Sequence, residues 1–167
     1  NRGWDTFYDS MDVEVSDMVP YIKASVLNNK VEGWLSKQKG DRPFLLWLHY
    51  MDVHEPYVPE KKYIDAVDPS IDMAEDEMFA LFKDVVLKRD VSDKKTVELL
   101  KKLYLAHLRE IDEATKEFFG ILEKMGLLED SVIIITADHG DEFGEHGGLS
   151  HDGKMYSELL NVPLIIF

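Results

Sequence analysis

The order of apolar and helical patterns predicts an α/β fold, with a mostly parallel sheet flanked by helices. Residues 44–48 form a continuous apolar run, and residues 131–136 are rich in β-branched side chains, both typical of buried strands. Between them, residues 92–125 carry apolar side chains at spacings of three and four, the pattern of a long amphipathic helix. Strand, helix and strand in this order predict a right-handed crossover between parallel strands.

The remaining segments add smaller elements to this unit. Residues 15–37 have apolar side chains close to a helical period, and residues 163–167 have the composition of a third strand. Residues 52–70 contain three prolines, which predict a loop. Residues 71–87 are acidic and predict a short surface helix. With 167 residues the chain has the size of one domain.

Composition and charge exclude several classes of protein. The net charge of −14 argues against nucleic-acid binding, because phosphates favour basic surfaces. The absence of cysteine excludes disulfides and thiolate metal ligands within the 167 residues. The longest apolar runs are too short to span a bilayer, so no membrane span is expected in this segment. The cellular compartment is left open.

Histidines mark two windows of the sequence where chemistry is expected. Five of the six histidines lie within residues 49–54 and 139–151. Each window follows a predicted strand, and the carboxyl ends of parallel strands meet at the sheet edge where ligands bind. We therefore expect the two windows to converge in space.

The second window begins with candidate metal ligands, Asp138 and His139, followed by Gly140. A carboxylate oxygen and an imidazole nitrogen are suitable ligands for a divalent cation such as Ca²⁺, Mn²⁺, Mg²⁺ or Zn²⁺. The alternative is an Asx-type turn followed by an unrelated histidine. Nearby carboxylates favour a cation, because crowded negative charges repel unless something offsets them, although a solvated acidic loop has the same composition. These carboxylates belong to Asp141, Glu142, Glu145 and Asp152.

Other polar residues of the windows are candidates for substrate chemistry. His54 could protonate a leaving oxygen, oriented by Asp52 or another carboxylate, or it could be an ordinary loop histidine. His151 and Lys154 could hold the oxygens of a tetrahedral anion, although a lone lysine is more often solvated. His107 lies on the apolar stripe of the long helix and is expected to be a core or edge residue.

The ordered set of motifs resembles the sulfatase branch of the alkaline phosphatase superfamily. The His-Glu-Pro-Tyr sequence that ends at residue 57 is similar to that family's His-x-Pro-Tyr-type loop. The Asp-His-Gly that begins at residue 138, with the Gly-Glu-His-Gly that follows it, is similar to a second signature. The resemblance extends, in order, over residues 2–7, 43–57, 104–126, 132–147 and 151–166.

This resemblance implies a partial sulfatase-like sandwich, with residues 1–167 forming the carboxy-terminal part of one incomplete catalytic domain. It implies that Asp138 and His139 bind a divalent metal ion and that His54 is the active-site histidine near the leaving group. It also implies that His151 contacts the substrate's oxyanions. Asp152 departs from the pattern, since Gly is common at that position.

The family's nucleophile motif, Cys/Ser-x-Pro-x-Arg, does not occur in the 167 residues. The resemblance implies an upstream nucleophile, which is formylglycine in a true sulfatase, so the isolated chain is expected to be inactive. A missing amino-terminal portion would leave sheet edges and apolar faces uncovered, so the chain is also expected to self-associate or to be poorly soluble. The predicted function of the parent protein is metal-dependent hydrolysis of small-molecule sulfate esters. The alternatives are a phosphodiesterase, phosphonate hydrolase or phosphoglycerol transferase acting on a phosphate ester, and an inactive structural subdomain.

Overall fold

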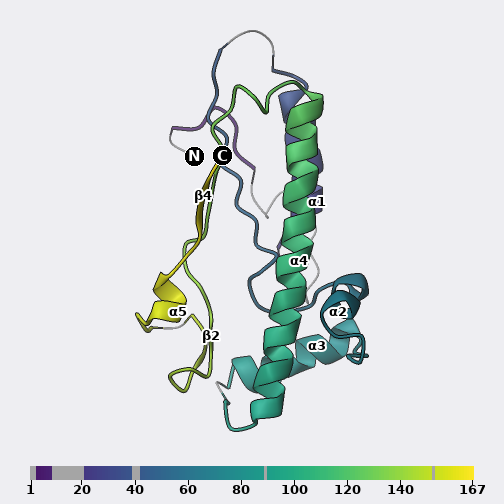
Figure 1. The fold of residues 1–167 in the computed structure, drawn as a ribbon, viewed down its shortest axis with the longest axis vertical. Coiled ribbons are helices and arrows are strands. Elements are labelled where there is room, and N and C mark those ends of the chain that lie inside the picture. The colour runs from purple at the N-terminus through teal and green to yellow at the C-terminus, as the bar shows by residue number, and fades with distance from the viewer. Residues whose placement is uncertain (1–2, 9–20, 39–41, 89, 152) are drawn as a thin grey trace.

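A single long helix organises the fold. The computed structural model describes residues 3–8, 21–38, 42–88, 90–151 and 153–167. Helix α4 (Lys94–Lys124) runs along most of the long axis of the molecule in Figure 1. Helices α1 (Ala24–Leu35) and α2 (Lys61–Val67) pack against α4.

The remaining elements are short. Helix α3 continues directly into a π-helical turn, η2, and the strands form two separate pairs. The bounds are α3 (Glu75–Leu81), η2 (Phe82–Val86), β1 (Ile134–Thr136), β2 (Glu142–Phe143), β3 (Leu149–Ser150), α5 (Ser157–Leu160) and β4 (Leu164–Ile166).

Helix α4 confirms the long helix predicted for residues 92–125. The Asp93 side chain accepts a hydrogen bond from the Lys95 amide and caps the first turn. Gly126, with φ of 68°, ends the helix in the left-handed conformation that glycine adopts without strain. None of the described helices has both the length and the apolar character needed to cross a bilayer.

The shorter helices agree in part with the sequence-based expectations. The acidic helix expected within residues 71–87 is confirmed as α3 and η2. The loop expected for residues 52–70 is wrong in its second half, because Ile64 buries one face of α2 against the core. Helix α1 begins at Ala24, whereas the pattern predicted a start near residue 15, and residues 9–20 lie outside the described part of the chain.

The described sheet differs from the mostly parallel one that the sequence predicted. Strands β1 and β4 pair antiparallel, with Ile134 opposite Ile166 and Thr136 opposite Leu164. Among the described residues between them, the only elements are the β2–β3 hairpin and the single turn of α5. Because no long crossover helix lies between them, the chain returns in the opposite direction, as antiparallel connections do.

Residues 44–48, predicted as a strand, pair with no described strand. Their backbone groups make no ladder hydrogen bonds to the described residues. The segment runs between α4 and the β1–β4 pair in Figure 1. Leu46 and Leu48 pack against the buried cluster of Val31, Leu35 and Leu122. Leu45 and Trp47 are 78% and 69% exposed. This alternation is that of a strand with one face covered and one face open.

Exposed apolar side chains continue across the neighbouring β1–β4 pair. The exposed members are Leu45, Trp47, Val132, Ile134, Leu164, Ile165, Ile166 and Phe167. Successive strand residues point to opposite sides, so both faces of this region carry exposed apolar groups. Large exposed apolar surface on a soluble protein marks a binding surface or a site of association. Open strand edges add unpaired backbone groups to the same region.

We predict that the isolated 167-residue chain self-associates through this region. Replacing Trp47 with Glu should shift the sedimentation profile towards monomer, because a charge cannot be buried there without a partner. Leu87 is exposed to a similar degree on a different element, so Leu87→Glu serves as the matched control and should leave association unchanged. A wild-type chain that sediments as a monomer at all concentrations would contradict the prediction.

Candidate active site

The two histidine windows come together at one end of the β1–β4 pair. The ring of His151 lies between those of His54 and His139, with centroid distances of 5.1 Å and 4.1 Å. The structure therefore brings together three of the five residues that the sequence singled out.

Two hydrogen bonds join the windows directly. The buried Tyr57 hydroxyl donates to Asp141 Oδ2 at 2.8 Å, and the Ser150 hydroxyl donates to Glu55 Oε1 at 2.7 Å. Burial raises the pKa of the Tyr57 hydroxyl, and the neighbouring Asp141 raises it further, so the phenol keeps its proton. Ser150 adopts φ of 65°, a left-handed conformation that is uncommon for serine.

The turn that carries Asp138 and His139 is fixed by close packing at Gly140. The Gly140 amide donates to the Leu159 carbonyl at 2.9 Å. A Cβ added to Gly140 would lie 2.1 Å from the Glu158 carbonyl oxygen, a clash that neither backbone can relieve without moving. Glycine is therefore required here because α5 approaches the turn closely.

The orientation of His139 suits a metal ligand. Its Nδ1 lies 2.9 Å from the Gly140 carbonyl oxygen, an acceptor, so Nδ1 carries the proton and donates it. Nε2 then keeps its lone pair, and Asp138 Oδ1 lies 3.8 Å from it. A backbone carbonyl behind the ring is the usual support of a metal-bound histidine. Asp138 and His139 therefore fit a shared divalent cation.

Other groups at the site extend the possible ligand set. Ligand atoms of His139, Asp141 and His151 lie within 4.8 Å of one another, as do those of His54, Glu55 and His151. Glu55 Oε2 is buried without a hydrogen-bond partner among the described residues, 3.7 Å from Nδ1 of both His54 and His151. Asp138 belongs to neither set, and its side chain is 71% exposed.

His54 is held by its own loop and not by Asp52. Its Nδ1 donates to the Glu55 carbonyl at 2.6 Å. Asp52 instead accepts from the Ala24 amide at 3.0 Å and 2.9 Å and caps α1. The prediction that Asp52 orients His54 is therefore wrong. Glu55 is the other nearby carboxylate that could orient this ring.

His151 and Lys154 occupy different surroundings. His151 Nδ1 faces Asp141 Oδ1 at 3.2 Å, which orients its ring. Lys154 Nζ donates to Glu142 Oε2 at 2.8 Å and to the His146 carbonyl at 3.2 Å. Lys154 is thus paired with a carboxylate instead of facing the three clustered histidines.

Lysines offset part of the acidic cluster that the sequence associated with a cation. Glu142 is buried, and two backbone amides, of His146 and Gly148, donate to it besides Lys154. Burial favours the protonated form, but these hydrogen bonds hold the pKa of the Glu142 carboxyl below its usual range. Glu145 pairs with Lys101 at 2.8 Å. Asp152 lies outside the described residues.

Sequence reasoning missed the residues that join the windows. Glu55 and Tyr57 stand inside the His-Glu-Pro-Tyr motif, but only the histidine was given a role. Ser150 and Asp141 have no local signal for pairing, since their partners lie 95 and 84 positions away. In the sequence, only the position of these four residues close to the histidines of each motif indicated that they belong to the site.

Comparisons with known proteins show which family the chain resembles. A family model described as Sulfatase matches residues 1–167. The chain is 26% identical to a choline-sulfatase of Rhizobium meliloti (strain 1021) over 168 residues, covering 92% of this chain and 33% of that protein. It is 25% identical over 152 residues to "Multifunctional alkaline phosphatase superfamily protein PehA" of Trinickia caryophylli, covering 78% of this chain and 29% of PehA.

A solved structure also resembles the fold. The structure of BT4656 in complex with its substrate D-glucosamine-2-N,6-O-disulfate superposes with a TM-score of 0.67, at 18% identity. The match covers 87% of this chain and 42% of that one. At this identity the likeness shows a shared α/β fold.

These similarities are consistent with the alkaline phosphatase superfamily. Because the family model covers residues 1–167, the chain belongs to the sulfatase family. It spans about a third of the length of the curated relatives just described.

The Glu142 contacts predict a pH-dependent contribution to stability. The pKa of Glu142 is lowered on folding, so its contribution is present above the unfolded value of 4.5 and is lost as pH falls through the folded value. Glu142→Gln should lower the free energy of unfolding by about 2 kcal/mol near neutral pH. The difference from wild type should shrink in acid, as measured by urea denaturation. Glu129→Gln, at an exposed position, is the control; identical pH profiles for Glu142→Gln and wild type would contradict this account.

The His139 geometry predicts where a divalent cation binds. Asp138→Asn should weaken Mn²⁺ binding about tenfold or more in isothermal titration, because a charged oxygen ligand becomes neutral. Asp130→Asn, at the opposite end of β1, should leave the affinity unchanged. Equal Mn²⁺ affinities for wild type and Asp138→Asn would rule out this site.

Proposed function

We propose that the protein to which this chain belongs hydrolyses small-molecule sulfate esters with the help of a divalent cation. The observation that supports this most directly is the clustering of His54, His139 and His151 in a chain of the sulfatase family. Similarity to proteins named choline-sulfatase and arylsulfatase points to the same ester class.

In this proposal His54 donates the proton that the leaving alcohol needs. Its Nδ1 is engaged by the Glu55 carbonyl, so the proton for the substrate would come from Nε2 of the protonated ring. The Glu55 carboxylate, 3.7 Å from the same ring, would stabilise the imidazolium before the transfer.

His151 would hold the sulfate oxygens beside His54. Asp141 accepts from its Nδ1, so Nε2 would serve as the donor to an oxyanion. Lys154 is the second candidate for this role. To reach the substrate it would have to leave Glu142, whose charge it neutralises.

Asp138 and His139 would hold the cation, together with ligands from outside the described residues. A divalent cation bound there would stabilise negative charge on the ester oxygens and lower the pKa of a hydroxyl nucleophile. The choice among Ca²⁺, Mn²⁺, Mg²⁺ and Zn²⁺ depends on those further ligands.

The nucleophile is the part of the reaction that these residues do not supply. We propose that residues 1–167 are the carboxy-terminal part of an incomplete catalytic domain whose nucleophile lies upstream, as formylglycine if the protein is a true sulfatase. The isolated chain would then be inactive. The chain covers 29% and 33% of two of the relatives, which is compatible with a nucleophile outside residues 1–167.

Phosphoryl chemistry is the second candidate function. The similarity to PehA, whose name describes it as a multifunctional member of the alkaline phosphatase superfamily, favours it. A phosphate ester presents the same tetrahedral anion to His54 and His151, so these residues do not discriminate between the two esters. The upstream nucleophile would decide, because a threonine there favours phosphoryl transfer.

We predict that the intact protein cleaves an aryl sulfate in the presence of Mn²⁺ or Ca²⁺, and that His54→Gln lowers kcat by about 10²–10⁴-fold. The matched control is His49→Gln, at an exposed position five residues earlier, which should keep wild-type kcat. Turnover of an aryl phosphate and not of the sulfate would favour the second candidate. Full activity of His54→Gln would contradict the assigned role.

A further inference from the structure

His107 lies on the buried face of helix α4, and its ring makes a specific polar contact. It is 2% exposed, and its Nε2 lies 2.9 Å from the amide nitrogen of the equally buried Val58. That amide has one proton to donate, so Nε2 must be the acceptor and carry no proton. A neutral His107 ring therefore carries its proton on Nδ1.

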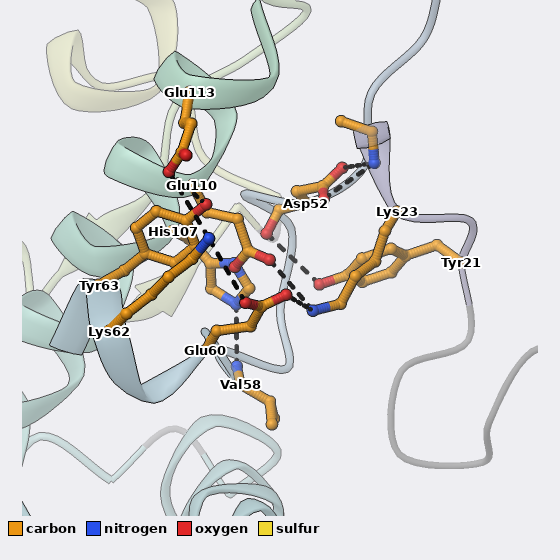
Figure 2. A network of polar contacts seen from close by, with 11 residues as sticks. Tyr21, Lys23, Asp52, Val58, Glu60, Lys62, Tyr63, His107, Glu110 and Glu113 are labelled. Atoms are coloured by element: carbon orange, nitrogen blue, oxygen red, sulfur yellow. Dashed lines mark hydrogen bonds and ion pairs between the residues drawn. The ribbon is translucent and has the colours of Figure 1, made fainter. Parts of the chain in front are cut away.

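A buried ion pair faces that proton. Glu110 Oε2 lies 3.5 Å from His107 Nδ1, while Glu110 Oε1 accepts from Lys23 at 3.1 Å (Figure 2). Burial alone would raise the pKa of Glu110, but the neighbouring His107 ring and the hydrogen bond from Lys23 lower it below its usual value. Glu110 Oε2 and His107 Nδ1 are both buried and make no hydrogen bond with any described residue, so their contact at 3.5 Å is electrostatic. Glu110 therefore stays ionised and holds the proton of His107 on Nδ1, away from Val58.

The same loop is tied down at its other end by Asp52. Both Asp52 carboxylate oxygens accept from the Ala24 amide. Figure 2 shows Asp52 in the same network as Lys23 and Glu110. Residues 52–58 are thus anchored to α1 at one end and to α4 at the other. His54 lies between the two anchors.

We propose that His107, held in one tautomer by the Lys23–Glu110 pair, is a positioning residue that fixes Val58 and thereby sets His54 against His151. The consequence for catalysis rests on the proposed function; the positioning itself does not. His107 touches neither His54 nor His151 in the described contacts, so its effect passes through the Val58 backbone and through the ring of Tyr57, whose centroid lies 6.5 Å from that of His107.

Two substitutions separate the hydrogen bond from the volume of the ring. His107→Leu removes the acceptor and leaves the Val58 amide buried without a partner. The free-energy cost of this unpaired donor is expected to open the loop. His107→Gln places an amide oxygen near the position of Nε2 and can restore the contact. Leu122→Ala, at a buried position near the far end of α4, is the control for general destabilisation.

Nuclear magnetic resonance of the protein tests the proposal without any turnover. In wild type, the ¹⁵N shifts should show Nε2 of His107 unprotonated, and the His54 and His151 rings should give mutual nuclear Overhauser effects. In His107→Leu, hydrogen exchange of the Val58 amide should accelerate about tenfold or more, and the ring contact should weaken. His107→Gln and Leu122→Ala should keep both signals.

Three results would overturn the proposal. The first is a proton on Nε2 of wild-type His107. The second is a His107→Gln variant in which the Val58 amide exchange and the His54–His151 contact are as impaired as in His107→Leu. If His107→Leu does not fold, loss of these two signals in His107→Gln has the same meaning. The third is an unchanged His54–His151 contact in a folded His107→Leu. An intact protein that has the wild-type signals but hydrolyses neither ester would remove the proposed function and leave the positioning role standing.

Discussion

The arrangement of the site depends on the hydrogen bonds that join two segments far apart in the sequence. Tyr57 binds Asp141 and Ser150 binds Glu55, and all four side chains are at least half buried. Hydrogen bonds sheltered from water are costly to break, because each group would be left without a partner. His54, His139 and His151 are placed by these contacts, since each histidine lies within three positions of one of the four residues.

Buried hydrogen bonds also connect the site to the core of the protein. The loop that carries His54 is held to α1 through Asp52 and to α4 through His107. Tyr57 of the same loop packs against Tyr104 and Phe143. The second segment is held by Glu142, which binds Lys154 and two backbone amides. Several charged groups are thus used structurally. This explains how a chain with net charge −14 folds around an acidic site.

The sequence predicted the long helix from a local pattern of apolar residues that survives in the fold. It predicted the convergence of the windows from the edge of a parallel sheet, and the windows converge although the strand pair β1–β4 is antiparallel. The helix at 92–125 follows from apolar spacing, and Asp138, His139 and His54 follow from short motifs. The parallel sheet was wrong for β1 and β4, since apolar runs identify a strand but not the direction of its partner. The roles of Glu55 and His107 could not be predicted, because they depend on partners about 50 to 100 residues away.

The central claim is that the two histidine windows form one site around a cation and an ester. Crystals of the intact protein grown with Mn²⁺ would test it most directly through anomalous diffraction. The account predicts an anomalous peak within bonding distance of Asp138 and His139, with the rings of His54 and His151 facing the same space. A Mn²⁺ peak elsewhere, or a His54 ring turned away from that peak, would contradict it.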